Sequence, residues 1–328
     1  GPLVREFENK LSSLWGVRNV IAVSNGTIAI QLALRALEVK GEVITTPFTW
    51  KATCTAIVWE GLKPRFCDIE EKTLCLDPKH VEEEINERTG AILPVNVYGN
   101  PPDFVEFARI SREHGIPIIY DGAHAANTFF EGDSCLSFGD VVATSFHATK
   151  LIHTAEGGAC VTNNDELADK IRAMRFFGFS ENLQETEIGT NGKMTELNAA
   201  MGLCVLDNLN SIESRRKEIE EIYDSQFGEN QKIIPVNFKS EKFQGNAIYY
   251  PILFQNEEEL LECVNRLNQR EIFPRRYFHP SLNITGNFSD EACPQSEGVS
   301  KRILCLPISP TMSINDAHRV LEAMFETL

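Results

Sequence analysis

One lysine, Lys150, lies in a loop of small and polar residues between two apolar runs, residues 140–145 and 159–162. Two glycines, Gly157 and Gly158, lead into the second run. Lysine is the side chain that forms Schiff bases, and its surroundings can activate the amine. Because most lysines are exposed, Lys150 taken alone could also be a solvated loop cation. The rest of the chain favours the chemical interpretation.

Three further candidates stand at or just after the ends of predicted strands: Asp121, Ser145 and Trp50. Ligands of parallel sheets collect at the carboxyl ends of the strands. We therefore expect these side chains to converge on one edge of a sheet although they are far apart in the sequence. Asp121 could instead cap a turn, and Trp50 could be a core aromatic residue.

A strand over residues 19–23 runs directly into Ser24, Asn25, Gly26 and Thr27, and a helix follows. The free N–H groups of a helix N-terminus in this position can bind an anion such as phosphate. The same pattern fits an ordinary helix capped by a serine or asparagine side chain. This stretch alone favours neither interpretation, but it adds another strand end to the expected site.

Strand and helix patterns alternate through the first half of the chain with short connections. This alternation predicts an α/β fold with a mostly parallel sheet covered by helices on both faces. A helical region over 195–227 changes from apolar to charged and amphipathic near its middle. We place the domain boundary there, which gives a large domain over 1–210 and a smaller α+β domain over 211–328. A loop over 177–193 has the length of loops that are often functional.

Composition limits the possible functions. The net charge of −16 argues against bulk binding to nucleic acid or to an anionic membrane, both of which favour a basic surface. No apolar stretch reaches the roughly 18 residues that span a bilayer, and we see no signal peptide. Nine scattered cysteines without a C-x-x-C pair are typical of reduced thiols in a cytoplasmic protein. The absence of H-E-x-x-H and of G-x-G-x-x-G after the first strand disfavours a metal hydrolase and a nicotinamide dehydrogenase, and we expect no metal.

Six segments, in order and with plausible spacing, resemble pyridoxal 5'-phosphate (PLP) enzymes of the aspartate aminotransferase fold type. More narrowly, the sequence resembles the DegT/DnrJ/EryC1/StrS family of nucleotide-sugar aminotransferases. The resemblance covers nearly the whole chain. The segments are residues 24–27, 47–53, 94–99, 120–125, 145–150 together with 156–158, and 189–196.

The resemblance implies a role for each candidate. Lys150 would form the Schiff base with PLP and later act as the base that moves a proton between the amino carbon and the cofactor. Asp121 would accept a hydrogen bond from the ring nitrogen and keep the ring protonated, which makes it an electron sink. Trp50 would stack on the ring. The N–H groups of Gly26 and Thr27 and the Ser145 hydroxyl would hold the phosphate. Asn191 of the partner subunit would also contact it, which implies a homodimer with shared active sites.

Two features depart from the family pattern. His124 stands where family members usually have a glutamine that contacts the ring oxygen of the cofactor. An imidazole can make this bond, but its protonation would add pH dependence near neutrality. Family members also usually carry additional sequence before Gly1, so part of the sugar-nucleotide pocket could be absent. The roles of His147 and His153 stay open between active-site support and structure.

Two stretches bear on the substrate. Residues 275–282 resemble the family's loop near the sugar, which makes Tyr277 and His279 candidates for substrate binding, with loop packing as an equal alternative. Residues 146–157 resemble a subgroup that acts on dTDP-linked 6-deoxy keto sugars. The expected reaction moves an amino group from glutamate to dTDP-4-keto-6-deoxyglucose. A 3-keto isomer, another PLP class such as a lyase, and a non-catalytic regulator that binds PLP or a sugar nucleotide are alternatives. A dehydratase branch replaces the lysine with histidine, so Lys150 favours transamination.

Overall fold

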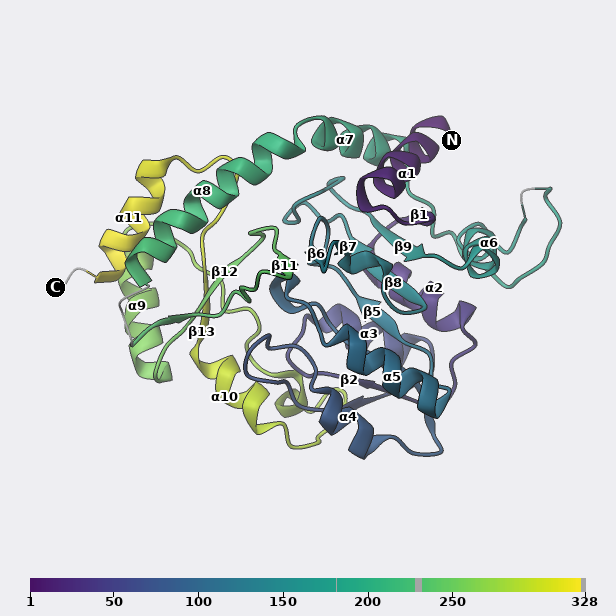
Figure 1. The fold of residues 1–328 in the computed structure, drawn as a ribbon, viewed down its shortest axis with the longest axis horizontal. Coiled ribbons are helices and arrows are strands. Elements are labelled where there is room, and N and C mark those ends of the chain that lie inside the picture. Colours follow the sequence, from purple (N-terminus) through teal and green to yellow (C-terminus); the bar gives the residue numbers. More distant parts are fainter. Residues whose placement is uncertain (181, 228–231, 326–328) are drawn as a thin grey trace.

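The structure, a computed structural model, describes residues 1–180, 182–227 and 232–325 (Figure 1). An α/β body contains the first two thirds of the chain, and the rest forms a smaller α+β part beside it. The elements of the body are α1 (Pro2–Trp15), β1 (Asn19–Val23), α2 (Gly26–Ala36), β2 (Glu42–Thr45), α3 (Lys51–Trp59), β3 (Lys63–Phe66), α4 (Pro78–Glu84), β4 (Thr89–Leu93), η1 (Val97–Gly99), α5 (Phe104–His114), β5 (Ile119–Asp121), β6 (Phe129–Phe130), β7 (Asp133–Ser134), η2 (Cys135–Ser137), β8 (Val141–Ser145), β9 (Gly158–Thr162), α6 (Asp165–Met174) and α7 (Glu196–Asp207).

The central sheet has the strand order β3-β2-β4-β5-β8-β9-β1, in which single parallel bridges, Ile92 to Ile118 and Val95 to Asp121, join β4 to β5. Its pairings are parallel except those of β9, which runs antiparallel to both β8 and β1. A loop without a crossover helix joins β8 to β9, and such a connection suits an antiparallel pair. The predicted mostly parallel sheet is therefore confirmed.

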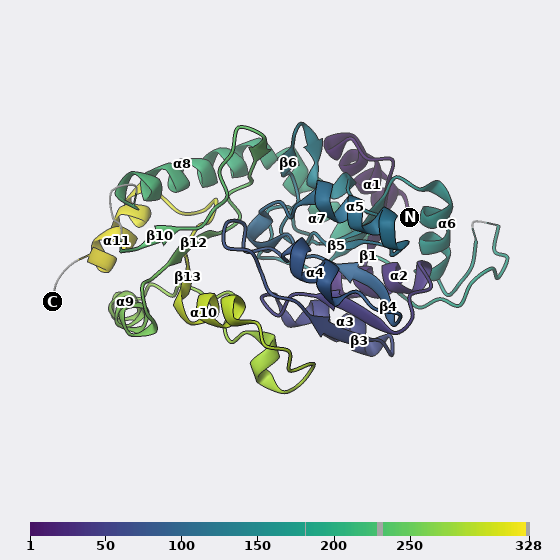
Figure 2. The same ribbon diagram turned by 60° about the horizontal axis from the view of Figure 1, so that its bottom comes forward.

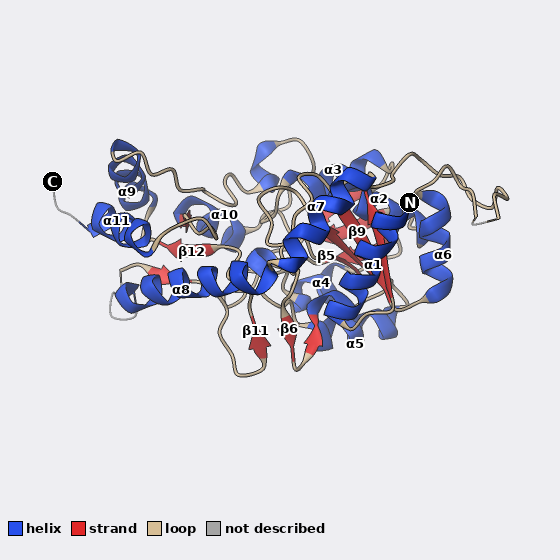
Figure 3. Ribbon diagram, turned by 90° about the horizontal axis from the view of Figure 1, so that it is seen from above, coloured by secondary structure: helices blue, strands red, loops and turns tan. Residues whose placement is uncertain are grey.

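Helices cover both faces of this sheet (Figure 3). Along β1, Val20 and Ala22 pack into one hydrophobic cluster, with α1, α4, α5 and α7. Ile21 and Val23 pack into the other cluster, with α2, α3 and α6. Successive side chains of a strand point to opposite faces, so a strand that is apolar throughout is buried on both sides. This layering fixes the carboxyl ends of the parallel strands at one edge.

The smaller part is built around the antiparallel sheet β10-β12-β13. A separate hydrophobic cluster joins this sheet to α8, α9 and α11. Figure 2 shows these three helices beside the sheet from a second direction. The elements are α8 (Leu209–Phe227), β10 (Ile234–Pro235), β11 (Phe243–Gln244), β12 (Tyr250–Leu253), α9 (Glu257–Gln269), η3 (Leu282–Thr285), α10 (Pro294–Arg302), β13 (Ile303–Leu306) and α11 (Ile314–Phe325).

The helical region expected over 195–227 is two helices, because α7 ends at Asp207 and α8 begins at Leu209. The domain boundary placed at residue 210 lies close to this break and stays a prediction. A strand pairing connects the two parts, because β11 pairs antiparallel with β6 of the body. A buried carboxylate makes a second link: Asp68 accepts the backbone N–H groups of Gln295 and Ser296 at the start of α10, at 2.7 and 2.8 Å.

In the described part of the chain, no helix combines the length and apolar character that crossing a membrane requires. Nor do the described residues hold a cluster of three or more His, Cys, Asp or Glu side chains that could bind a metal ion.

Candidate active site

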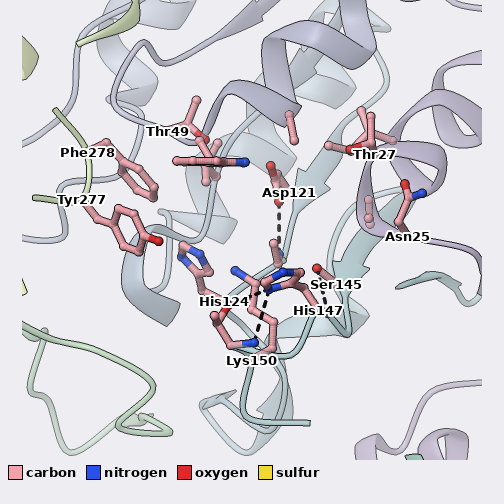
Figure 4. Close-up of a pocket in the computed structure, with 18 of the residues that line it drawn as sticks. Asn25, Thr27, Thr49, Asp121, His124, Ser145, His147, Lys150, Tyr277 and Phe278 are labelled. Atoms are coloured by element: carbon pink, nitrogen blue, oxygen red, sulfur yellow. Dashed lines mark hydrogen bonds between the residues drawn. The ribbon is translucent and has the colours of Figure 1, made fainter. Parts of the chain in front are cut away.

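The strand ends meet around one cavity of about 250 Å³. Asp121 ends β5 and Ser145 ends β8, while Trp50 precedes α3 after β2. All but two of the residues expected at the site line this cavity. The members present are Gly26, Thr27, Trp50, Asp121, His124, Ser145, Lys150 and Tyr277. The close-up in Figure 4 shows Asp121, His124, Ser145 and Lys150 around a common space, with Tyr277 and Phe278 at its side.

Lys150 lies in the loop between β8 and β9, where its backbone N–H donates to the carbonyl of His147 at 2.8 Å. Its Nζ lies 6.0 Å from the centre of the Tyr249 ring. Burial lowers the pKa of Lys150 to about 8, against the opposing charge of Asp121. Desolvation disfavours the charged form of an amine, and the neutral form is the nucleophile. The surroundings of Lys150 therefore shift its amine toward the neutral, nucleophilic form.

Asp121 is buried at the end of β5. Its Oδ1 accepts the backbone N–H of Ala123 at 3.1 Å, and its Oδ2 accepts the hydroxyl of Thr53 at 2.7 Å. Burial raises the pKa of Asp121, while the Thr53 and Ala123 bonds and the charge of Lys150 lower it. A cation bound against this carboxylate would offset the cost of burying its charge.

The N-terminus of α2 is open toward Ser145. Asn25 caps the helix, because its Oδ1 accepts the N–H of Ile28 at 2.9 Å. The N–H groups of Gly26 and Thr27 have no hydrogen-bond partner among the described residues. A Cβ on Gly158 would lie 2.5 Å from the backbone carbonyl carbon of Asn25, so only glycine allows β9 to approach the helix this closely. Free N–H groups beside a hydroxyl at a helix N-terminus can bind an anion.

His124 is buried, and its Nδ1 accepts the backbone N–H of Tyr98 at 3.2 Å. This bond assigns the ring proton to Nε2. The ring stacks on Phe278, with centroids 6.0 Å apart and planes at 4°. Burial, followed by the charge of Lys150, lowers the pKa of His124 well below its ordinary value. The expected protonation of His124 near neutral pH is therefore wrong, because the histidine has no carboxylate partner among the described residues and stays neutral.

Two expected residues lie outside the cavity. Asn191 is exposed, forms a bridge with Phe176 and accepts a hydrogen bond from the Lys193 ammonium. It lies at the base of the arm over residues 177–193, whose described residues extend away from the body beside α6 in Figure 1. His279 is also exposed, with its Nδ1 3.2 Å from the carbonyl of Ser300. The roles expected for Asn191 and His279 stay predictions.

The two histidines left open differ in position. His147 lines the cavity, with its Nε2 3.7 Å from Oε1 of Glu156 and its Nδ1 2.9 Å from the Thr149 hydroxyl. His153 does not line it, and its buried Nδ1 has no hydrogen-bond partner in the described part of the chain.

Several residues of the site were not singled out from the sequence: Thr49, Thr53, Tyr249 and Phe278. The first two fall inside the segment 47–53, so their closeness to Trp50 was a usable signal. Trp50 itself is 57% exposed and meets Tyr277 edge-on, with ring centroids 5.9 Å apart. Tyr249 and Phe278 come from the smaller part. Phe278 falls inside the segment 275–282, which was a usable signal, whereas no local pattern indicates that Tyr249 reaches the cavity.

One cavity at the edge of the mostly parallel sheet contains three kinds of group. They are an amine of lowered pKa, a buried carboxylate and the free N–H groups of a helix N-terminus. This donor set fits PLP, whose aldehyde, ring nitrogen and phosphate need these three partners. Fold and site together define a PLP-dependent enzyme of the aspartate aminotransferase fold type.

The chain belongs to the DegT/DnrJ/EryC1/StrS aminotransferase family, whose sequence model matches residues 1–325. It is 38% identical to a dTDP-4-amino-4,6-dideoxy-D-glucose transaminase of Shigella dysenteriae, over 100% of this chain and 90% of that protein. A protein of Escherichia coli with the same description is 34% identical, over 94% of this chain and 85% of its own length.

Solved structures agree with this placement. The structure of DesI in the presence of its TDP-sugar product matches with a TM-score of 0.92 at 32% identity, over 99% of this chain and 86% of that one. The PLP form of a putative sugar aminotransferase, Spr1654 of Streptococcus pneumoniae, has the same TM-score of 0.92 at 26% identity, over 99% and 90% of the two chains. The protein is an aminotransferase, and its cofactor is PLP.

Proposed function

We propose that this enzyme transfers an amino group from glutamate to dTDP-4-keto-6-deoxyglucose and forms dTDP-4-amino-4,6-dideoxyglucose. The observation that carries the chemistry is the pair Lys150 and Asp121 facing one cavity beside the open N-terminus of α2. The substrate rests on the two relatives described as transaminases of this amino sugar. Nine free cysteine thiols support a cytoplasmic location, because reduced thiols persist in a reducing compartment.

When PLP is bound, it supplies an aldehyde for covalent attachment and a ring that takes up the electron pair left by proton removal. Lys150 would provide the attaching amine, and its Nζ, once displaced by an incoming amine, would take the proton from the amino carbon and deliver it to the cofactor. Asp121 would hold the proton on the ring nitrogen of the bound cofactor. Because Asp121 is buried, water would be excluded from this ion pair, which would strengthen it.

The neutral amine of Lys150 gives a pH prediction. Attachment of PLP to the cofactor-free protein requires the unprotonated amine, whose pKa is about 8. The attachment rate should therefore rise as pH increases and level off above about 8, in stopped-flow absorbance measurements. The charge of Asp121 raises this pKa, so Asp121→Asn should move the midpoint to lower pH. A midpoint near 10 would show that the lysine is solvated.

We further propose a homodimer in which Asn191 reaches the cofactor phosphate of the partner subunit. The arm over 177–193 supports this, because Phe177, Leu183 and Ile188 on it are 50, 70 and 81% exposed. Exposed apolar groups gathered on one segment mark an interaction surface.

Mixing inactive chains tests the shared sites. A Lys150→Ala chain and an Asn191→Ala chain, unfolded and refolded together, should form heterodimers in which one of the two sites carries neither change. Random pairing makes about half of the dimers heterodimers, and each heterodimer has one intact site out of two. Activity should therefore return to about a quarter of the wild-type value. Each variant refolded alone serves as the control. If the mixture is no more active than the Asn191→Ala chain alone, Asn191 serves its own subunit or has no role at the phosphate.

Product analysis tests the substrate. The enzyme, glutamate and either the 4-keto or the 3-keto 6-deoxy sugar should be compared with dTDP, UDP and GDP carriers. The proposal expects the 4-amino product from the dTDP-linked 4-keto sugar at the highest kcat/KM. Turnover of the 3-keto sugar alone would favour the isomeric reaction. Binding of the sugar nucleotide without formation of the pyridoxamine form by glutamate would favour a regulator.

A further inference from the structure

Two threonine hydroxyls connect Asp121 to the start of α3. Thr53 Oγ1 lies 2.7 Å from Asp121 Oδ2, and Thr49 Oγ1 lies 2.8 Å from Thr53 Oγ1. All three side chains are buried, with 6% or less of their surface exposed. Thr49 borders the cavity, whereas Thr53 does not line it. Thr53 therefore touches the carboxylate without any contact to a group bound in the cavity.

The direction of this chain follows from the donors available. An ionised carboxylate only accepts hydrogen bonds, and a hydroxyl has one proton to donate. Thr53 must use its proton on Asp121, so its oxygen accepts the proton of Thr49. Hydrogen bonds in series polarise one another, which strengthens the bond that reaches the carboxylate. Because this direction of donation delivers a proton donor to Asp121 Oδ2, it favours the ionised form of the carboxylate.

The other groups around Asp121 give little support to its charge. Burial raises the pKa of the Cys54 thiol, with Asp121 adding to the shift, so this neighbour is neutral. His124 is neutral as well. Lys150 lowers the pKa of Asp121, but less than Thr53 and the N–H of Ala123 do. Among the groups that lower the pKa of Asp121, the hydroxyl of Thr53 therefore has the largest effect.

We propose that Thr53, supported by Thr49, is a positioning residue that keeps Asp121 ionised and turned toward the ring nitrogen of the cofactor. The proposal rests on PLP binding against Asp121 and is independent of which sugar is aminated. A failure of the sugar assignment would therefore leave it unaffected.

The cofactor-free protein gives the first test, through urea unfolding of Thr53→Val at acidic and at neutral pH. A carboxylate whose folded pKa is raised contributes stability at low pH that is lost as pH rises through that pKa. Removing the Thr53 donor raises this pKa further, so the loss of stability should be larger at neutral than at acidic pH. The difference should disappear in an Asp121→Asn background. Thr53→Ser should restore the wild-type behaviour.

A matched control is available in Thr45→Val. Thr45 is also buried, and its hydroxyl donates to the carbonyl of Leu93 at 2.7 Å, with no contact to Asp121. Its loss of stability should not depend on pH. If Thr53→Val shows the same pH-independent loss, with or without Asp121, the hydroxyl is structural and the proposal is overturned.

The loaded enzyme gives the second test. Thr53→Val should lower kcat by about 10- to 100-fold, the size expected when a hydrogen bond to a charged group is lost, with little change in the KM for the amino donor. The NMR shift of the ring nitrogen in isotope-labelled PLP should move toward the unprotonated form. Thr49→Val should change kcat and the ring-nitrogen shift in the same direction, but by less. If Thr53→Val does not fold, Thr49→Val takes its place in the test. An unchanged ring-nitrogen shift in these variants would contradict the proposal.

Discussion

Lys150→Ala is expected to lower the rate of transamination by at least about 10⁴-fold. The change removes both the amine that attaches the cofactor and the base that moves the proton, and proton transfer by a positioned side chain alone contributes roughly 10²- to 10⁴-fold. The Asp121 carboxylate and the open N-terminus of α2 are unchanged in this variant. It should therefore still bind PLP, but without the absorbance of the covalently attached form.

Steady-state kinetics and the absorbance spectrum measure this effect. Lys40→Ala is a suitable control, because Lys40 is exposed and does not line the cavity. Near-normal turnover by Lys150→Ala would show that another amine carries the chemistry.

Asp121→Asn is expected to have the second largest effect, a fall in kcat of about 10²- to 10³-fold, which is the cost of losing one preorganised electrostatic partner in an active site. The asparagine keeps the shape of the side chain and can still accept the Thr53 hydrogen bond. It cannot hold a proton on the ring nitrogen by charge, so the ring becomes a weaker electron sink.

The same change should stabilise the cofactor-free protein at neutral pH. The folded pKa of Asp121 is raised by burial, so its ionised form costs stability once the pH exceeds that pKa. Urea unfolding of the cofactor-free proteins should show Asp121→Asn to be more stable than wild type at neutral pH, with a smaller difference in acid. Functional sites commonly show this trade-off, in which a substitution lowers activity and raises stability. Equal kcat values for the two proteins would mean that Asp121 does not contact the ring.

Much of the site could be predicted because its residues are tied to strand ends. Asp121, Ser145 and Gly26 each follow a short apolar run, and a parallel sheet brings such positions to one edge whatever their separation in sequence. Lys150 was recognisable from its loop of small residues before Gly157 and Gly158. The layered body follows from the same alternation of patterns.

The parts that could not be predicted depend on contacts between distant segments. Tyr249 reaches the cavity from the smaller part, where it directly precedes β12, and its position there depends on how the two parts pack. The neutral state of His124 depends on burial and on the charge of Lys150, neither of which its sequence position reveals. The break between α7 and α8 at Asn208 interrupts a stretch whose composition suits one helix.

Reduction of the PLP-loaded protein with borohydride, followed by peptide mapping by mass spectrometry, tests the central claim most directly. Borohydride fixes the bond between the cofactor and its lysine, so the modified residue can be identified. The account predicts one modified lysine in each chain, Lys150, and no modified peptide in the Lys150→Ala variant. Modification at a different lysine, or none in a protein shown to contain PLP, would contradict it.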